Sequence, residues 1–297
     1  STTAMVCDVS SGEVRSSLMG IRHSSGQLAM LLGPVITGTL NTWFGIRTTY
    51  LLLAPLGVVS MILVAMNTPN IVYEHKSKKI DWPGILFLLL AMTGISILMS
   101  TGGTIFPWVS WCGISIMVLS AISTVAFWLI EWKEDNPLIN FNIFSYTGMK
   151  PVMMYKLLMQ ISNGLFGGFL ILYCQQIIGM NTMQTGFFGL ARIAAILGSS
   201  VVGVWIGKKG RLTASAMTAS LLTLTAEFML VFIHKNTSFL WIFLAQILLS
   251  LSTSFGTIPL SLAMSEILPV ELQGNGFGTF FFCENLGSLL GTALVAL

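Results

Sequence analysis

Charged residues are few in this chain, and they are gathered in short clusters between long uncharged stretches. Asp, Glu, Lys and Arg make up 8% of the 297 residues, while 54% of the residues are hydrophobic. For example, residues 48–73, 82–130, 157–191 and 236–265 contain no Asp, Glu, Lys or Arg. A helix needs about 20 mostly apolar residues to cross the ~30 Å hydrocarbon core of a bilayer. Each stretch fits one or two crossings, so the sequence predicts an all-α polytopic membrane protein.

Nine transmembrane helices are predicted from the apolar segments. Helices are favoured because the bilayer core offers no water to unpaired backbone groups, and because the ~10-residue alternating segments of a β-barrel are missing from the sequence. The expected spans are residues 17–40, 46–66, 83–101, 111–130, 152–175, 184–206, 212–233, 239–262 and 275–297.

The basic residues predict the orientation, because Lys and Arg are enriched in cytoplasmic loops. If the nine spans alternate in direction, Arg47 and Lys235 fall at one face, Arg192 lies within a span, and the other eleven basic residues fall at the opposite face. These eleven are Arg15, Arg22, Lys76, Lys78, Lys79, Lys133, Lys150, Lys156, Lys208, Lys209 and Arg211. We therefore expect a multi-pass protein of the plasma membrane with the N-terminus of this chain in the cytoplasm.

The first span contains a glycine and proline pattern. Gly20 is followed by Ala29 and then by the run Gly33-Pro34-Val35-Ile36-Thr37-Gly38. Proline bends a helix by removing a backbone hydrogen bond, and glycines let a neighbouring membrane helix approach closely. By itself the pattern predicts a kinked, tightly packed helix, whatever the function of the protein.

This pattern resembles the antiporter motif in the fifth helix of the proton-coupled drug exporters of the major facilitator superfamily. That motif has a Gly-Pro-x-x-Gly-Gly core with two upstream glycines. Gly20, Gly33, Pro34 and Gly38 match it, whereas Ala29 and Thr37 stand in place of glycines.

Two further segments are similar to the fourteen-helix branch of that superfamily. Lys78-Lys79-Ile80-Asp81-Trp82-Pro83-Gly84 is similar to the entry into the extra central helix pair of the branch, and the segment from Asn136 to Phe144 is similar to the entry into its second half. The resemblance implies helices five to thirteen of a major-facilitator-type helical bundle, truncated at both ends. It divides the chain into residues 1–70, 71–136 and 137–297, which are the end of the first half, the central linker with two extra helices, and the incomplete second half.

Three ionisable residues at membrane depth are candidates for the transport pathway, because their insertion costs about 2.5–3.5 kcal/mol each. Glu284 lies near the middle of the last span and forms a polar stripe with Ser288 and Gly291. It is interpreted either as a proton or cation site or as a structural hydrogen-bonding group. Arg192 and Glu227 lie at similar depth in consecutive spans. They are expected to form a structural ion pair, with a charge relay as the alternative.

Two stripes of uncharged polar residues complete the candidate pathway, and ordinary interhelical hydrogen bonds would produce the same pattern. At helical spacing, the fifth span carries Lys156, Gln160, Asn163 and Gly167, and the eighth span carries Gln246, Ser250 and Ser254.

The resemblance predicts proton-coupled export of lipophilic or amphipathic drug-like compounds by alternating access. The expected partners are a small-molecule substrate, protons and the lipid bilayer, and the protein is expected to be a monomer. We expect no cofactor, metal ion or nucleic acid. A facilitator-type importer or a non-transporting sensor of the same fold is the alternative. A membrane enzyme is less favoured, because His23, His75 and His234 lie in separate parts of the chain, which we interpret as loops, without an acidic partner.

Overall fold

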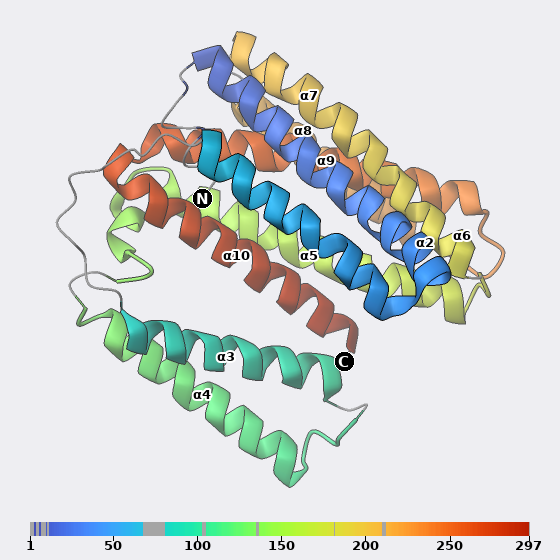
Figure 1. Ribbon diagram of the computed structural model, residues 1–297, viewed down its shortest axis with the longest axis horizontal. Coiled ribbons are helices and arrows are strands. Elements are labelled where there is room, and N and C mark those ends of the chain that lie inside the picture. The colour runs from blue at the N-terminus through green and yellow to red at the C-terminus, as the bar shows by residue number, and fades with distance from the viewer. Residues whose placement is uncertain are drawn as a thin grey trace.

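A computed structural model describes residues 12–67, 81–102, 105–134, 137–180, 182–209 and 212–296, together with residues 3, 6 and 10. Over these residues the chain folds into helices and contains no β-strand. The long helices, labelled as in Figure 1, are α2 (Gly12–Asn67), α3 (Trp82–Thr101), α4 (Trp111–Glu131), α5 (Met149–Gln176), α7 (Arg192–Lys209), α8 (Leu212–Val231), α9 (Phe239–Ile267) and α10 (Val270–Ala296). The short elements are η1 (Phe141–Ser145), α6 (Thr182–Gly186) and η2 (Phe187–Ala191).

The first two predicted spans form one continuous helical segment, α2, with a sharp break at Gly45. The backbone of Gly45 has φ 76° and ψ 165°, a conformation that side chains with a Cβ rarely adopt. The second half of α2 folds back beside the first half (Figure 1). The break lies between the predicted spans 17–40 and 46–66.

Six of the described helices are long and apolar enough to cross a membrane. They cover Trp82–Met99, Trp111–Glu131, Met149–Gln176, Gln184–Ile206, Leu212–Val231 and Phe239–Ile267. Each corresponds to one predicted span. The other three predicted spans are helical in α2 and, up to residue 296, in α10. They are less apolar or shorter, since Gly, Ser and Thr are frequent in the first half of α2 and in α10, and the apolar part of the second half of α2 is limited to Ala54–Met66.

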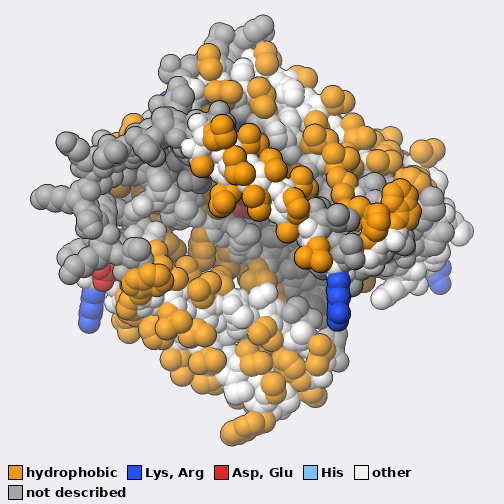
Figure 2. Space-filling model, viewed as in Figure 1, with side chains coloured by type: hydrophobic (Ala, Val, Ile, Leu, Met, Phe, Trp, Pro, Cys, Tyr) orange, Lys and Arg blue, Asp and Glu red, His pale blue; other side chains and the backbone are white. Residues whose placement is uncertain are grey.

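The outer surface of the bundle is apolar. Hydrophobic side chains cover much of the face seen in Figure 2, with few charged side chains among them. Val201 on α7 and Leu221 on α8 are 64% and 63% exposed. A soluble monomer rarely exposes such a large apolar surface, so this surface fits contact with lipid.

Helices α3 and α4 form a hairpin that lies to one side of the bundle and contacts it through α10 (Figure 1). Asp81 caps the start of α3, where its Oδ1 accepts a hydrogen bond of 2.8 Å from the backbone N–H of Gly84. The carboxylate of Glu131, at the end of α4, accepts a hydrogen bond from the backbone N–H of Ile139. The two carboxylates therefore fix the ends of the hairpin. The division into residues 1–70, 71–136 and 137–297 remains a prediction.

Helix pairs that are distant in sequence approach closely at glycines. A Cβ added to Gly291 on α10 would lie 2.1 Å from the carbonyl oxygen of Ile161 on α5, and one added to Gly164 on α5 would lie 2.5 Å from the carbonyl oxygen of Ser288. Helices α2 and α7 meet in the same way, because a Cβ on Gly203 would lie 3.1 Å from Cα of Gly20. Backbone contact of this kind is the usual way in which helices associate in lipid.

Some sequence predictions concern residues outside the described part of the chain. These are the basic turn at Lys76–Lys79, together with Arg211 and Leu297. The side chains of Lys208 and Lys209 at the end of α7 are likewise outside the description.

The glycine contact between α5 and α10 predicts a stability difference between two substitutions on the same helix. Gly291→Ala should lower the melting temperature of the purified protein, because its Cβ would overlap the Ile161 carbonyl and overpacking costs about 1–3 kcal/mol. Gly278→Ala is the matched control, since nothing lies within 4 Å of an added Cβ there and alanine favours the helix by about 1 kcal/mol. Equal melting temperatures for the two variants would contradict the close packing.

Candidate functional site

Polar side chains lie between two apolar clusters of the bundle. One cluster contains Met149 and Met153 at the start of α5 and Met264 near the end of α9. The other contains Leu170 and Cys174 near the end of α5. The middle of α5 therefore lies between two apolar layers, and it is there that its polar residues are placed.

The centre of this region is an ion pair between α5 and α10. Lys156 Nζ lies 3.2 Å from Glu284 Oε1. Lys156 also donates a hydrogen bond of 3.3 Å to the Thr257 hydroxyl on α9, and its ammonium group lies 5.0 Å from the centre of the Phe280 ring. A carboxylate, a hydroxyl and an aromatic ring from two other helices thus surround the ammonium group.

Two amide side chains extend this arrangement along α5. Gln160 Nε2 donates a hydrogen bond of 3.3 Å to Glu284 Oε1, and Asn163 Nδ2 donates one of 3.2 Å to Gln160 Oε1. We call Lys156, Gln160, Asn163, Thr257 and Glu284 the central polar cluster. Lys156, Gln160 and Asn163 of the predicted stripe on the fifth span belong to this cluster, and Gly167 does not. Thr257 also belongs to it, although the sequence did not single it out.

The two charged members of the cluster differ in exposure. The side chain of Lys156 is 0% exposed, whereas that of Glu284 is 29% exposed. A buried ammonium ion is stable only when it is paired and hydrogen-bonded. Glu284 is therefore the partly exposed member of the pair, whereas Lys156 is fully enclosed by the described helices.

The expected ion pair between Arg192 and Glu227 is not present among the described side chains. Arg192 Nη1 instead lies 3.3 Å from the sulfur of Met30 on α2. The Glu227 carboxylate accepts a hydrogen bond from the Ser162 hydroxyl on α5. The physical reason is the packing order: α7 packs mainly against α2 and α9, while α8 packs against α9. Helices α7 and α8 therefore hardly touch each other, and the two charges face different partners.

None of the three polar residues predicted on the eighth span, Gln246, Ser250 and Ser254, belongs to the central polar cluster. Gln246 and Ser250 on α9 are half-buried, and the backbone carbonyl of Ser250 accepts a hydrogen bond from Thr253. Ser254 is fully buried and donates to the Ala195 carbonyl on α7, at 2.8 Å. It therefore contributes to the contact between α7 and α9.

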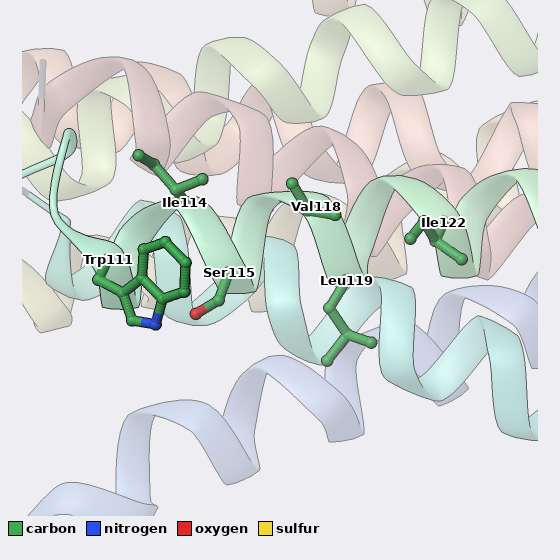
Figure 3. Close-up of a pocket in the computed structure, with 6 residues that line it drawn as sticks. All are labelled: Trp111, Ile114, Ser115, Val118, Leu119 and Ile122. Atoms are coloured by element: carbon green, nitrogen blue, oxygen red, sulfur yellow. The ribbon is translucent and has the colours of Figure 1, made fainter.

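The groove drawn in Figure 3 lies on the outer part of the α3–α4 hairpin. Its lining residues all come from α4: Trp111, Ile114, Ser115, Val118, Leu119 and Ile122. Trp111 is 89% exposed, and the groove contains no ionisable side chain. Its composition fits a lipid-facing surface, so it is not the candidate functional site.

Comparison with known proteins gives a family. The sequence profile of the Major Facilitator Superfamily matches residues 1–292. The chain belongs to the major facilitator superfamily.

Several characterised proteins of the superfamily are similar to this chain at low identity. Multidrug resistance protein 3 of Bacillus subtilis (strain 168) is 21% identical over 294 residues, which cover 98% of this chain and 56% of that protein. The multidrug transporter protein MdtP of the same organism is 20% identical over 98% of this chain and 54% of its own length. Citrate exporter 1 of Yarrowia lipolytica is 24% identical over 71% of this chain and 32% of its own length. The chain thus spans about half the length of the first two relatives.

The segment that resembles the antiporter motif lies in the first half of α2. Gly20 faces α7, where an added Cβ would lie 2.7 Å from the carbonyl oxygen of Ser199. An added Cβ on Gly33 would meet nothing within 4 Å. Pro34 and Gly38 lie within the helical range of α2, but the packing of their side-chain positions lies outside the described part of the structure.

Two basic residues were misinterpreted from the sequence. Lys156 was counted with the charges at the cytoplasmic face, but it is buried inside the bundle and paired with Glu284. His23 was interpreted as a loop residue, but it lies within α2, and its Nδ1 is 2.8 Å from the Ser199 hydroxyl on α7. One signal was available in the sequence: a lysine inside a predicted membrane span needs an acidic partner, and Glu284 lies near the middle of another span.

The ion pair predicts non-additive effects on stability. Glu284→Gln leaves Lys156 buried without its counter-charge, and breaking one side of a buried pair typically costs about 3–5 kcal/mol. We expect the lower end of this range, because Glu284 is 29% exposed. Adding Lys156→Met to Glu284→Gln should recover much of the loss in a thermal or denaturant unfolding measurement.

Glu227→Gln is the matched control for this cycle. It also neutralises a carboxylate of the bundle, but the glutamine oxygen can still accept the Ser162 hydrogen bond, so a smaller loss is expected. The single variant Lys156→Met completes the cycle. If the loss of stability in the double variant equals the sum of the losses in Lys156→Met and Glu284→Gln, the two side chains do not stabilise each other.

Proposed function

We propose that this protein is a secondary active transporter that exports lipophilic or amphipathic compounds in exchange for protons. The observation that carries the proposal is the Lys156–Glu284 pair between two apolar layers of the bundle. Ionisable residues at membrane depth are costly and commonly mark a substrate or proton pathway. The names of two relatives, a multidrug resistance protein and a multidrug transporter, support export of drug-like compounds.

Glu284 is the proposed site of proton and substrate exchange. When it is ionised, it neutralises Lys156 at 3.2 Å. Binding of a proton to Glu284 removes that compensation, and a cationic substrate would compete with Lys156 for the same carboxylate. The proton and the substrate would then bind to the same carboxylate and could not occupy it at the same time. Antiport requires such exclusive binding.

The remaining pathway residues are proposed to contact the substrate rather than the proton. Gln160 and Asn163 lie next to Glu284 and offer amide groups. Gln246 and Ser250 are proposed to line the pathway from α9. Arg192 and Glu227 lie apart from the central polar cluster, so we assign them supporting roles at the contacts of α7 with α2 and of α8 with α5.

Alternating access would supply the mechanical step. Transporters of this kind rock two helical halves about a site near the midplane. One charge that moves down a potential of 100 mV releases about 2.3 kcal/mol, which would support a gradient of tens-fold per proton. We further propose a monomer in the plasma membrane with the N-terminus of this chain in the cytoplasm, without cofactor or nucleic-acid partner.

Proton-coupled export is tested in inverted vesicles that contain the protein. A pH gradient, acidic inside, should drive uptake of a fluorescent lipophilic cation, and collapse of the gradient should abolish it. Glu284→Gln should remove the gradient-driven component, because the exchanging carboxylate is lost, while Glu227→Gln should retain most of it.

The alternatives give different results in the same vesicles. Uptake that follows only the concentration gradient of the compound would indicate a facilitator, and absence of uptake for all tested compounds would favour a sensor. Gradient-driven uptake of a carboxylate such as citrate, instead of the cation, would overturn the proposed substrate class while keeping the coupling.

The proposed orientation predicts the labelling of three introduced cysteines. Lys78→Cys and Lys209→Cys should react with an impermeant maleimide only from the cytoplasmic side, and Lys235→Cys only from the opposite side, because basic loops are retained in the cytoplasm. The test uses intact cells and inverted vesicles in parallel. Labelling of positions 78 and 209 from opposite sides would exclude the nine-span topology.

A further inference from the structure

One face of α5 is buried at both ends and exposed between them. Lys156 and Cys174 are each 0% exposed. Between them, Gln160 and Asn163 are half-buried and Gly167 is exposed. These positions follow one another at intervals of three, four or seven residues, so they lie on one face of the helix. The polar face of α5 is therefore open to its surroundings at Gly167.

Gly167 and Gly164 have different surroundings, although they are three residues apart. A Cβ added to Gly164 would lie 2.5 Å from the carbonyl oxygen of Ser288 on α10, whereas one added to Gly167 would meet nothing within 4 Å. Glycine within a helix is less favourable than alanine. The close contact with α10 explains the glycine at position 164. No close contact explains it at position 167, where the space beside the backbone is available to a ligand.

Hydrogen-bonded side chains connect this position to the Lys156–Glu284 pair. Gln160 donates to Glu284 at 3.3 Å, and Asn163 donates to Gln160 at 3.2 Å. Gly167 follows Asn163 by one helical turn and lies about 10 Å along the axis from Gln160. One turn further, Ile171 is an apolar side chain that is 43% exposed. A carboxylate, two amides, an open backbone position and an apolar side chain thus follow one another along α5.

We propose that Gly167 is a specificity-determining residue, against which the apolar body of an amphipathic cation packs while its charged group binds at Glu284. The charge of Glu284, which is 29% exposed, complements a cation, and Ile171 offers apolar contact beyond the amides. A side chain at position 167 would fill the space that the body of the compound needs, so this position limits the width of the compounds that bind. The inference rests on the proposed function, because it concerns the same substrate.

Chemical modification tests whether Gly167 faces a water-accessible ligand site or lipid. The full chain, with its four native cysteines replaced by alanine, is placed in lipid nanodiscs and treated with a charged, water-soluble methanethiosulfonate reagent. Gly167→Cys should react. Tetraphenylphosphonium at about ten times its dissociation constant should slow the reaction about tenfold, because only the free protein reacts.

Phe169→Cys is the matched control for this modification. Phe169 is 47% exposed and lies at nearly the same depth as Gly167, but two residues along a helix turn the side chain by about 200°, to the opposite side of α5. This position should face lipid and remain unmodified. An unreactive Gly167→Cys, or a reaction that tetraphenylphosphonium does not slow, would overturn the proposal.

A larger side chain at position 167 tests the limit on width. Gly167→Leu should weaken the binding of tetraphenylphosphonium to the purified protein about tenfold, which is the order of effect expected from steric overlap. The slimmer cation phenyltrimethylammonium should be affected less. The melting temperature should not fall, because nothing lies within 4 Å of the added Cβ and leucine favours a helix.

Gly57→Leu on α2 is the matched control, since nothing lies within 4 Å of an added Cβ there either. It should leave the binding of both cations unchanged. Unchanged binding of tetraphenylphosphonium in Gly167→Leu, an equal loss for both cations, or an equal loss in Gly57→Leu would overturn the proposal.

The outcomes also separate this inference from the proposed function, because the binding measurement needs no pH gradient. Selective loss of tetraphenylphosphonium binding in Gly167→Leu, without gradient-driven uptake in the vesicles, would support the assigned position and reject the antiport. Gradient-driven uptake in the vesicles, with binding that Gly167→Leu does not change, would reject the assigned position and retain the antiport.

Discussion

The backbone contact between α5 and α10 is the feature on which the rest of the site depends. Gly164, Gly287 and Gly291 leave no room for a Cβ, because a Cβ added to any of them would lie less than 3 Å from a backbone atom of the opposite helix. This close approach brings the relatively short side chain of Glu284 within 3.2 Å of Lys156. A wider helix separation would leave a lysine charge uncompensated inside an apolar bundle, which is among the costliest arrangements in a protein interior.

The placement of this pair between two apolar clusters has mechanical consequences. The apolar clusters at the two ends of α5 hold the helices together without directional bonds. The middle layer depends on charges and hydrogen bonds, whose strength changes when a single proton is added. The proposed alternating-access mechanism needs a centre of this kind, where charges and hydrogen bonds rather than apolar contacts join the helices.

Sequence patterns predicted the helices well because the bilayer requirement acts on each segment separately. The predicted spans agree with the described helices, and the turn between the first two falls at Gly45, where a positive φ is required. The prediction of which side chains on different helices form an ion pair was wrong. Arg192 and Glu227 lie on consecutive helices, but α7 packs against α2 and α9 while α8 packs against α9, so the two charges do not meet.

The sequence by itself determined that this chain is a bundle of membrane helices, which segments are helical, and which face of α5 is polar. These properties follow from local hydrophobicity and helical periodicity, which need no knowledge of neighbours. Only the tertiary structure decided that Lys156 pairs with Glu284, that Glu227 bonds to Ser162, and that His23 meets Ser199 across α2 and α7. Pairing between helices depends on which glycines of which helices meet, and no single segment carries that information.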